Sequence, residues 1–196
     1  MDADGENLKR LTKSNQNEFK PIWSPDGRWI AYTTWSHARG GQIYKMRSDG
    51  KGKPRQLTDI EAFYTDLAFS PDGSTIVAMR GNEFLRNQTF SEFGGLRIPL
   101  ELISLPVKGG EQIVIKALES GRYPHFGPET DRVYLTGDDG LFSLRLNGTD
   151  HRDEMMVNAP RGNRRGDDPP RAEVIYMHPD GHSVLAFANK QVWWIA

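Results

Sequence analysis

Short apolar runs recur along the chain, and tight polar turns separate them. The run Trp29–Tyr32 is apolar at every position, which is typical of a strand in a sheet that packs between two neighbours. It follows Pro21–Trp23 across the turn Ser24-Pro25-Asp26-Gly27. Proline suits the second position of such a turn, aspartate the third, and glycine the left-handed conformation that follows. The segment Pro21–Tyr32 therefore predicts a β-hairpin with a bulge after its turn.

The same hairpin pattern returns three times. Leu67–Ala78 and Ile175–Ala186 keep the Pro-Asp-Gly turn, whereas Pro124–Leu135 fits the frame without its turn glycine. The turn prolines, Pro25, Pro71, Pro128 and Pro179, follow one another at steps of 46, 57 and 51 residues. A period of about 40–50 residues built from short strands is typical of the blades of a β-propeller.

A second repeated turn shows where each repeated unit begins and ends. Met46–Gly50 precedes Pro54–Thr58, just as Met1–Gly5 precedes Leu8–Thr12. Each unit is therefore expected to hold four antiparallel strands, a to d, with glycine turns between a and b and between c and d. The predicted fold is an all-β propeller segment in one domain, with units at about 13–58, 59–116, 117–157 and 158–196 and with residues 1–12 as an outer strand.

These motifs resemble a known family. Trp-Ser-Pro-Asp-Gly, then Ile43-Tyr44 with Met46 and Asp49-Gly50, then Arg55 with Leu57-Thr58, look like the TolB-like propeller repeat. The resemblance implies a periplasmic or secreted location, and propellers of this type usually have more than four blades. Two arrangements follow. Leu8–Thr12 could close a four-blade ring as strand d of the last blade, or the chain could be part of a larger propeller with an open arc, which we favour.

A finer resemblance concerns the later units. Gly140–Arg152 and Asn189–Trp193 are similar to the late TolB-like blades that precede amidohydrolase domains. This implies a metal-dependent hydrolase barrel further along a longer chain. The sequence holds no His-x-His pair of such a barrel, so a catalytic domain of that kind would lie outside these residues.

Composition narrows the function classes. The 25 basic residues nearly balance the 26 acidic ones, which argues against a nucleic-acid partner. There is no cysteine, and no apolar run approaches the ~18 residues that a membrane-spanning helix needs, so we expect no membrane insertion.

His178 and His182 flank a turn rather than share a helix face, and a metal-dependent propeller lyase is the weakest of three hypotheses. We expect no catalytic residue, metal ligand or cofactor.

Recognition is expected at one face of the propeller, where the b–c and d–a loops lie together. The first b–c loop carries a tryptophan and a histidine, the long second one carries three phenylalanines, and the last d–a loop carries four arginines. Arginine is well suited to paired contacts with carboxylates or phosphates. The predicted binding residues are Trp35, His37, Arg39, Phe84, Arg86, Arg161, Arg164 and Arg165.

The leading hypothesis is thus a non-catalytic propeller module that binds a protein or peptide through these loops. The alternative, from another class, is the propeller portion of a larger amidohydrolase or peptidase. The sequence leaves the oligomeric state open.

Overall fold

The computed structural model describes residues 6, 8–36, 38–81, 100–119, 121–156, 172–188 and 190–196. This part of the chain folds into fifteen strands in four antiparallel sheets, here called blades 1 to 4. The strands are β1 (Asn17–Trp23), β2 (Trp29–Trp35), β3 (Ile43–Arg47) and β4 (Arg55–Gln56) in blade 1; β5 (Phe63–Phe69), β6 (Thr75–Gly81), β7 (Leu100–Pro106) and β8 (Ile113–Leu118) in blade 2; β9 (Arg122–Phe126), β10 (Arg132–Thr136), β11 (Gly140–Arg145) and β12 (Arg152–Met156) in blade 3; and β13 (Ala172–Met177), β14 (Val184–Ala188) and β15 (Gln191–Ile195) in blade 4.

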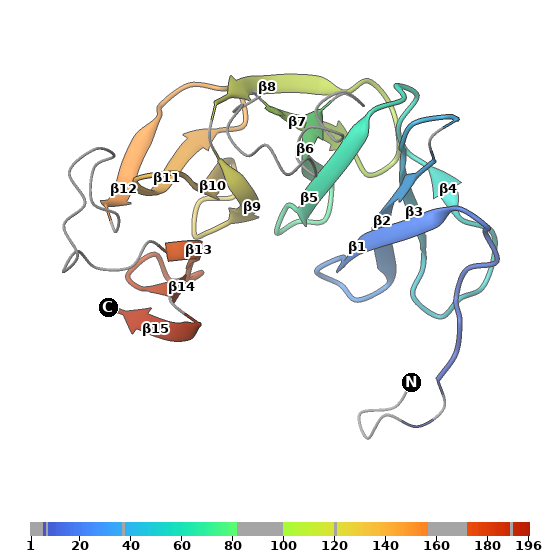
Figure 1. Cartoon of the computed structure of the whole chain (residues 1–196), viewed down its shortest axis with the longest axis horizontal. Coiled ribbons are helices and arrows are strands. Elements are labelled where there is room, and N and C mark those ends of the chain that lie inside the picture. The colour runs from blue at the N-terminus through green and yellow to red at the C-terminus, as the bar shows by residue number, and fades with distance from the viewer. Residues whose placement is uncertain are drawn as a thin grey trace.

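Each blade is a meander whose strands pair in chain order. The four blades follow one another around an open arc, and the first strands, β1, β5, β9 and β13, lie along its inner side (Figure 1). This is the arrangement of β-propeller blades, so the all-β propeller predicted from the repeats is confirmed.

The predicted hairpin turn forms as its residue types require. The Gly27 N–H donates to the carbonyl of Ser24 at 2.9 Å, and Gly27 has a φ of +68°. The Asp26 carboxylate accepts the Ser24 hydroxyl at 2.6 Å and the Arg28 N–H at 3.0 Å. Gly73 in blade 2 and Gly181 in blade 4 close the same turn at φ +70° and +74°.

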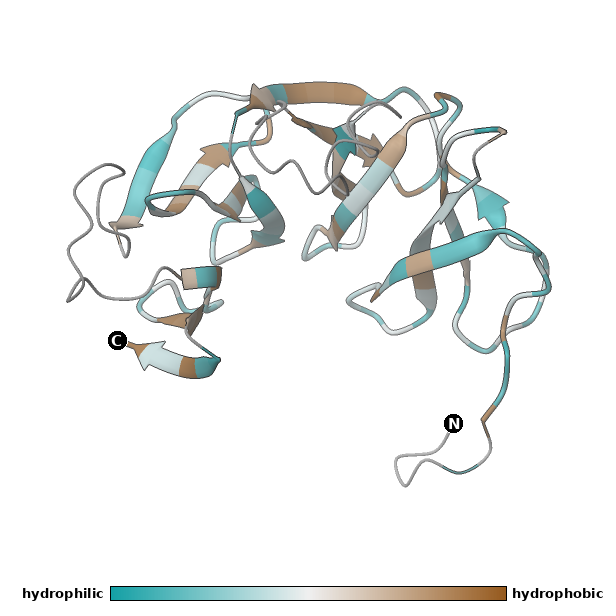
Figure 2. Ribbon diagram, in the orientation of Figure 1, coloured by the Kyte–Doolittle hydropathy of each residue, from teal (hydrophilic) through white to brown (hydrophobic). Residues whose placement is uncertain are grey.

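The apolar core lies between the blades rather than at the centre of the arc. Each of three clusters joins two consecutive blades, for example Ala31 and Ile43 against Ile76, and Val77 and Met79 against Val133. Strands such as β2 and β6 are therefore buried on both faces, as the run Trp29–Tyr32 predicted. Figure 2 shows the outer strands β4 and β12 as polar and β8 as apolar.

Among the described residues near the start of the chain, 8–12 do not form the expected outer strand. Residues 8–16 carry no strand pairing, and β15 pairs only with β14 in the part of the chain that is described. Leu11 packs instead beside Ile30, Tyr32 and Met46 of blade 1. The described residues therefore do not close a four-blade ring, and Figure 1 shows an open arc.

Candidate functional site

Trp35 lies in the core and not in an exposed loop. It ends β2 with 2% of its surface exposed, and its ring meets Phe63 edge-on at 5.8 Å. The loop that follows folds against blade 2, where Gly41 and Ala62 exchange backbone hydrogen bonds of 3.0 and 3.2 Å. A side chain at Gly41 would come within 2.5 Å of the Thr34 carbonyl, so this close approach requires glycine. Trp35 was predicted as a binding residue of an exposed loop. It is buried instead, because the pairing of Gly41 with Ala62 brings this loop down onto the next blade.

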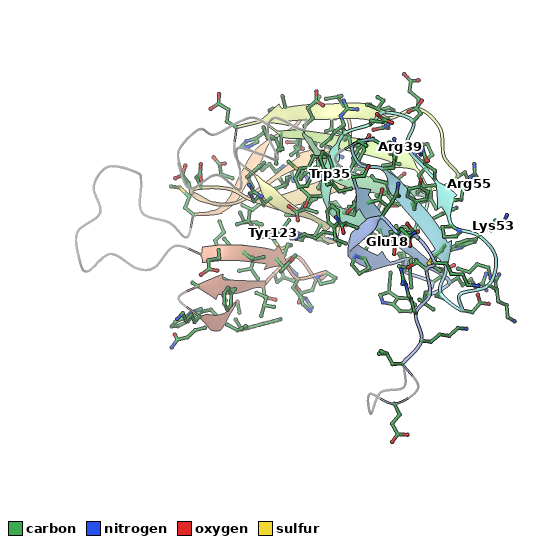
Figure 3. The ribbon with its side chains drawn as sticks, turned by 45° about the vertical axis from the view of Figure 1, so that its right-hand side comes forward. Glu18, Trp35, Arg39, Lys53, Arg55 and Tyr123 are labelled. Atoms are coloured by element: carbon green, nitrogen blue, oxygen red, sulfur yellow. The ribbon has the colours of Figure 1, made fainter. Side chains whose placement is uncertain are left out.

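Arg39 is the other predicted binding residue in the described part. Its side chain is exposed at the tip of the same loop, and its backbone N–H donates to the Ser36 hydroxyl at 3.1 Å (Figure 3). The remaining six, His37, Phe84, Arg86, Arg161, Arg164 and Arg165, lie outside the described residues.

A pocket of about 400 Å³ opens between blades 2 and 3. It is formed by the end of β8, where the d–a connection begins, and by the b–c turn Gly137–Gly140. It therefore lies on the face at which recognition was predicted. Its lining residues are Lys116, Ala117, Leu118, Glu119, Gly137, Asp138, Asp139, Gly140, Leu141, Phe142, His151, Asp153, Met155 and Met156.

The pocket joins an acidic wall to an apolar floor. Glu119, Asp138, Asp139 and Asp153 contribute four carboxylates, against the single ammonium group of Lys116. Phe142 stacks on the ring of His151 with centroids 5.2 Å apart. This combination suits a cationic group carried on an aliphatic or aromatic stem.

Glycines shape the floor of the pocket. A side chain at Gly137 would come within 3.0 Å of the Phe142 ring, and one at Gly140 within 2.0 Å of the Met155 carbonyl. Gly140 also has a φ of +145°, which other residues rarely adopt. The turn closes through a 2.7 Å hydrogen bond from the Gly137 N–H to the Gly140 carbonyl. Asp138 and Asp139 are thereby held at its tip.

A second polar cluster lies along the inner strands, and the sequence reasoning missed it. The ammonium of Lys20 on β1 lies 3.1 Å from the carboxylate of Asp66 on β5 and 5.9 Å from the ring centroid of Tyr123 on β9. Each of these three residues begins a bulge in its strand and has a left-handed backbone, with φ between +49° and +56°. Tyr123 is part of β9, one of the inner strands (Figure 3).

The inner cluster continues into blade 4. His125 accepts the Met177 N–H at Nε2 over 2.7 Å, and its ring lies 4.9 Å from that of Tyr176. Burial lowers the pKa of His125 to about 4, so the ring is neutral at pH 7. Burial also raises the pKa of Tyr176, to which Tyr123 and Asp66 add while Lys20 opposes them.

The signal for this cluster was present in the repeats. Lys20, Asp66 and Tyr123 each stand four residues before the residue that opens the turn, namely Ser24, Ser70 and Gly127. Three of the four copies hold a polar or aromatic residue at this strand position, and the fourth has Val174 there, whereas apolar types recur at core positions.

His178 and His182, which are four residues apart in the sequence, do not come together at one site. His178 Nδ1 lies 2.9 Å from the Asp180 carboxylate, and its ring meets that of Trp194 at 5.3 Å, whereas His182 is an exposed turn residue. Within the described ranges, no group of three or more His, Cys, Asp or Glu side chains is placed to hold a metal ion. Over the described ranges, no helix is long and apolar enough to cross a membrane.

Comparison with known proteins bears on the fold. The structure superposes on TolB of Acinetobacter baumannii with a TM-score of 0.65 over 94% of this chain and 41% of that one, at 16% identity. The chain therefore has a β-propeller fold like that of TolB. An oligogalacturonate lyase in complex with manganese also matches, with a TM-score of 0.64 over 94% of this chain and 51% of that one, at 15% identity.

Sequence relatives match over shorter stretches of this chain. A Tol-Pal system protein TolB of Thioalkalivibrio sulfidiphilus is 41% identical over 54 residues, which are 28% of this chain and 12% of that protein. An uncharacterized peptidase of Bacillus subtilis, YuxL, is 36% identical over 66 residues, or 34% of this chain and 10% of that protein. No family model matches the chain. The chain thus aligns with about a tenth of the length of these two relatives.

Proposed function

We propose that this TolB-like propeller is a binding module for a protein or peptide, which it contacts on the face formed by the b–c and d–a connections. The observation that carries the proposal is the pocket of about 400 Å³ on that face, which is lined by four carboxylates and the ring of Phe142. The match to a protein named for the Tol-Pal system supports a protein partner.

The pocket chemistry specifies which part of a partner it would hold. A lysine or arginine side chain places an apolar stem beside Phe142 and Met155 and its cationic end near Asp139 and Asp153. Attraction between opposite charges at an exposed site acts mainly on the association rate and weakens with salt. We therefore expect the partner to present a basic residue and its binding to weaken as ionic strength rises.

The test begins with a library of random 12-residue peptides displayed on phage and selected on the wild-type chain. The affinity of the selected peptides is then measured by fluorescence anisotropy for wild type and for the double variant Asp139→Asn with Asp153→Asn. We expect the variant to bind at least tenfold more weakly. The matched control is Asp49→Asn with Glu111→Gln, which removes two exposed carboxylates at the c–d turns on the opposite face and should change affinity less than twofold.

Two results would reject the pocket as the recognition site. One is a set of selected peptides without an excess of lysine or arginine. The other is equal affinity of the pocket variant and the control variant.

The predicted arginines form a separate arm of the same proposal. Replacing Arg161, Arg164 and Arg165 together by alanine should weaken capture of the selected peptides without lowering the midpoint of thermal unfolding. Unchanged capture by this variant would remove the last d–a loop from the proposed interface.

A second candidate function is the propeller portion of a larger hydrolase, which the stretch of 36% identity with the peptidase YuxL favours over a lyase. In such a protein the same face would position or admit substrate for a catalytic domain. The parent reading frame decides this: several hundred further residues with a peptidase or amidohydrolase active-site motif would support it, and their absence would reject it.

A further inference from the structure

Three cationic side chains meet between blades 1 and 2, at the c–d turns and therefore on the face opposite the acidic pocket. Lys45 of β3 lies directly opposite Arg55 of β4, the outer strand of blade 1 (Figure 3). Lys108 belongs to the c–d turn of blade 2, in which the Gly109 N–H donates to the Pro106 carbonyl at 2.8 Å. The Arg55 guanidinium lies against this turn, because a side chain at Gly109 would come within 3.2 Å of Arg55 Nη2. We call Lys45, Arg55 and Lys108 the basic cluster.

Lys45 is buried, which is unusual for a lysine. Its exposed fraction is 8%, and its ammonium lies 4.7 Å from the ring centroid of Trp29. Burial lowers the pKa of Lys45, and the positive charges of Arg55 and Lys108 lower it further. A buried ammonium is costly unless it is paired. Lys45 is therefore held in surroundings that oppose its own charge.

The acidic residues of the neighbouring turns do not neutralise the basic cluster. Asp26 accepts the Ser24 hydroxyl at 2.6 Å, and Asp49 pairs with Arg47 at 2.5 Å. Glu111, which follows the blade 2 turn, is exposed and is not among the charges that act on the lysine of β3. Across the residues that the structure describes, no member of the cluster has an ion-pair partner. Like charges opposite each other on neighbouring strands destabilise a sheet, so an anion would offset this excess positive charge.

The residue types of the cluster suit a phosphate group. Arginine offers two parallel N–H donors that match two phosphate oxygens, and a lysine ammonium adds a point charge. A phosphate monoester carries about −1.5 to −2 charges at pH 7 and has three strong acceptor oxygens. A carboxylate carries a single charge and two oxygens, so it would leave more of the cluster uncompensated. Arg55 and Lys108 are exposed, which leaves the cluster accessible to a ligand in solution.

We propose that the basic cluster is a binding site for the phosphate group of a soluble phosphate monoester. Arg55 binds two of the phosphate oxygens from blade 1, and Lys108 contacts the group from blade 2. Lys45 supplies the third positive charge at the base of the site, with the ring of Trp29 behind it. The bound phosphate thereby links the two blades. The site does not depend on the acidic pocket or on the proposed peptide partner, because it lies on the other face.

Inorganic phosphate is the probe, and the backbone amide signals of Arg55, Lys108 and Gly109 report its binding in NMR titrations at constant ionic strength. We expect saturable shifts for the wild type. Lys45→Met keeps the aliphatic stem and removes the charge, whereas Arg55→Gln removes an exposed guanidinium, and each should raise Kd at least tenfold. The matched control is Arg122→Gln, at an exposed arginine that begins β9 in blade 3, and it should change Kd less than twofold.

Stability gives an independent readout of the same site. Without phosphate, Lys45→Met should have a urea midpoint equal to or above that of the wild type, because it removes a buried charge that two like charges oppose. Phosphate should raise the midpoint of the wild type and leave that of Lys45→Met unchanged, since a ligand stabilises only the folded state that binds it. An equal rise in both proteins would make phosphate a general stabilising salt and overturn the proposal.

Three results of the titrations would also overturn it. Sodium acetate that causes the same shifts with equal affinity would show that the cluster attracts any counterion. Equal affinities of Arg55→Gln and Arg122→Gln would separate phosphate binding from the cluster. Binding to vesicles of phosphatidylcholine mixed with phosphatidic acid, without a response to inorganic phosphate, would make a membrane surface the ligand.

Discussion

The ammonium of Lys20 lies 3.1 Å from the carboxylate of Asp66, and both residues have left-handed backbones at equivalent positions of neighbouring inner strands. Bulges of this kind usually place glycine at the left-handed position. Here the chain accepts a strained backbone, which directs two charged side chains toward each other between blades 1 and 2. The Asp66 side chain is nearly buried, whereas that of Lys20 is half exposed.

Two substitutions at Lys20 separate the effect of backbone strain on stability from that of the ion pair with Asp66. Lys20→Ala loses the ion pair and keeps the strain, whereas Lys20→Gly loses the pair and relieves the strain. We expect both variants to be less stable than wild type, and the glycine variant to be more stable than the alanine variant by about 1 kcal/mol. Urea denaturation of the three proteins measures the difference. Equal stabilities of the two variants would show that the bulge carries no strain.

The glycine turns should differ in their tolerance of a side chain. A side chain at Gly27 meets open space, so Gly27→Ala should cost about 1 kcal/mol from its positive φ alone. At Gly181 the added carbon would also lie 2.8 Å from the Pro128 ring, so Gly181→Ala should cost about 2 kcal/mol or more. Valine at Gly27 or Gly73 should cost at least about 1–2 kcal/mol. Free energies of unfolding test this order, and a neutral Gly181→Ala would contradict it.

His125 makes stability depend on pH. Its pKa is about 4 in the folded chain, below the ordinary value of 6.5, because the ring is buried. Between these values the unfolded chain binds the extra proton, so stability is highest above pH 6.5 and falls as the pH drops toward 4. The loss can reach about 3 kcal/mol.

The matched pair His125→Gln and His182→Gln tests this assignment, since His182 is exposed. The free energy of unfolding is measured from pH 7.5 to 4. His125→Gln should have a flatter profile than wild type, and His182→Gln should follow wild type. Parallel profiles for all three proteins would assign the acid sensitivity to other groups.

Arg132 begins β10, directly after the turn of blade 3 that lacks the turn glycine. Its guanidinium is fully buried, donates to Ser143 at 2.8 Å and to the Asp150 carbonyl at 2.9 Å, and pairs with the carboxylates of Asp150 and Glu129. Removing one partner of a buried ionic network costs about 3–5 kcal/mol. Arg132→Gln should therefore lower the free energy of unfolding by about that amount.

Arg145 provides the comparison for Arg132, because it pairs with Asp131 in the same network but is partly exposed. Arg145→Gln should cost less than about 1 kcal/mol. Denaturant unfolding of both variants decides the matter. Similar costs would mean that burial does not set the strength of these pairs.

The sequence by itself determined the repeated units of this protein. Turn residues such as Pro25, Asp26 and Gly27 act through local backbone geometry, and runs such as Trp29–Tyr32 are apolar at every position, so both can be read from neighbouring positions in the chain. The all-β blades and their order follow from these local signals.

Only the tertiary structure decided which side chains meet. The burial of Trp35 depends on Gly41 pairing with Ala62 of the next blade, and the pair Lys20–Asp66 joins residues that are far apart in the chain. The acidic pocket likewise combines the end of β8 with the Gly137–Gly140 turn. Contacts between blades depend on how the sheets pack around the arc. No short window of sequence encodes this packing, because the residues that meet are far apart in the chain.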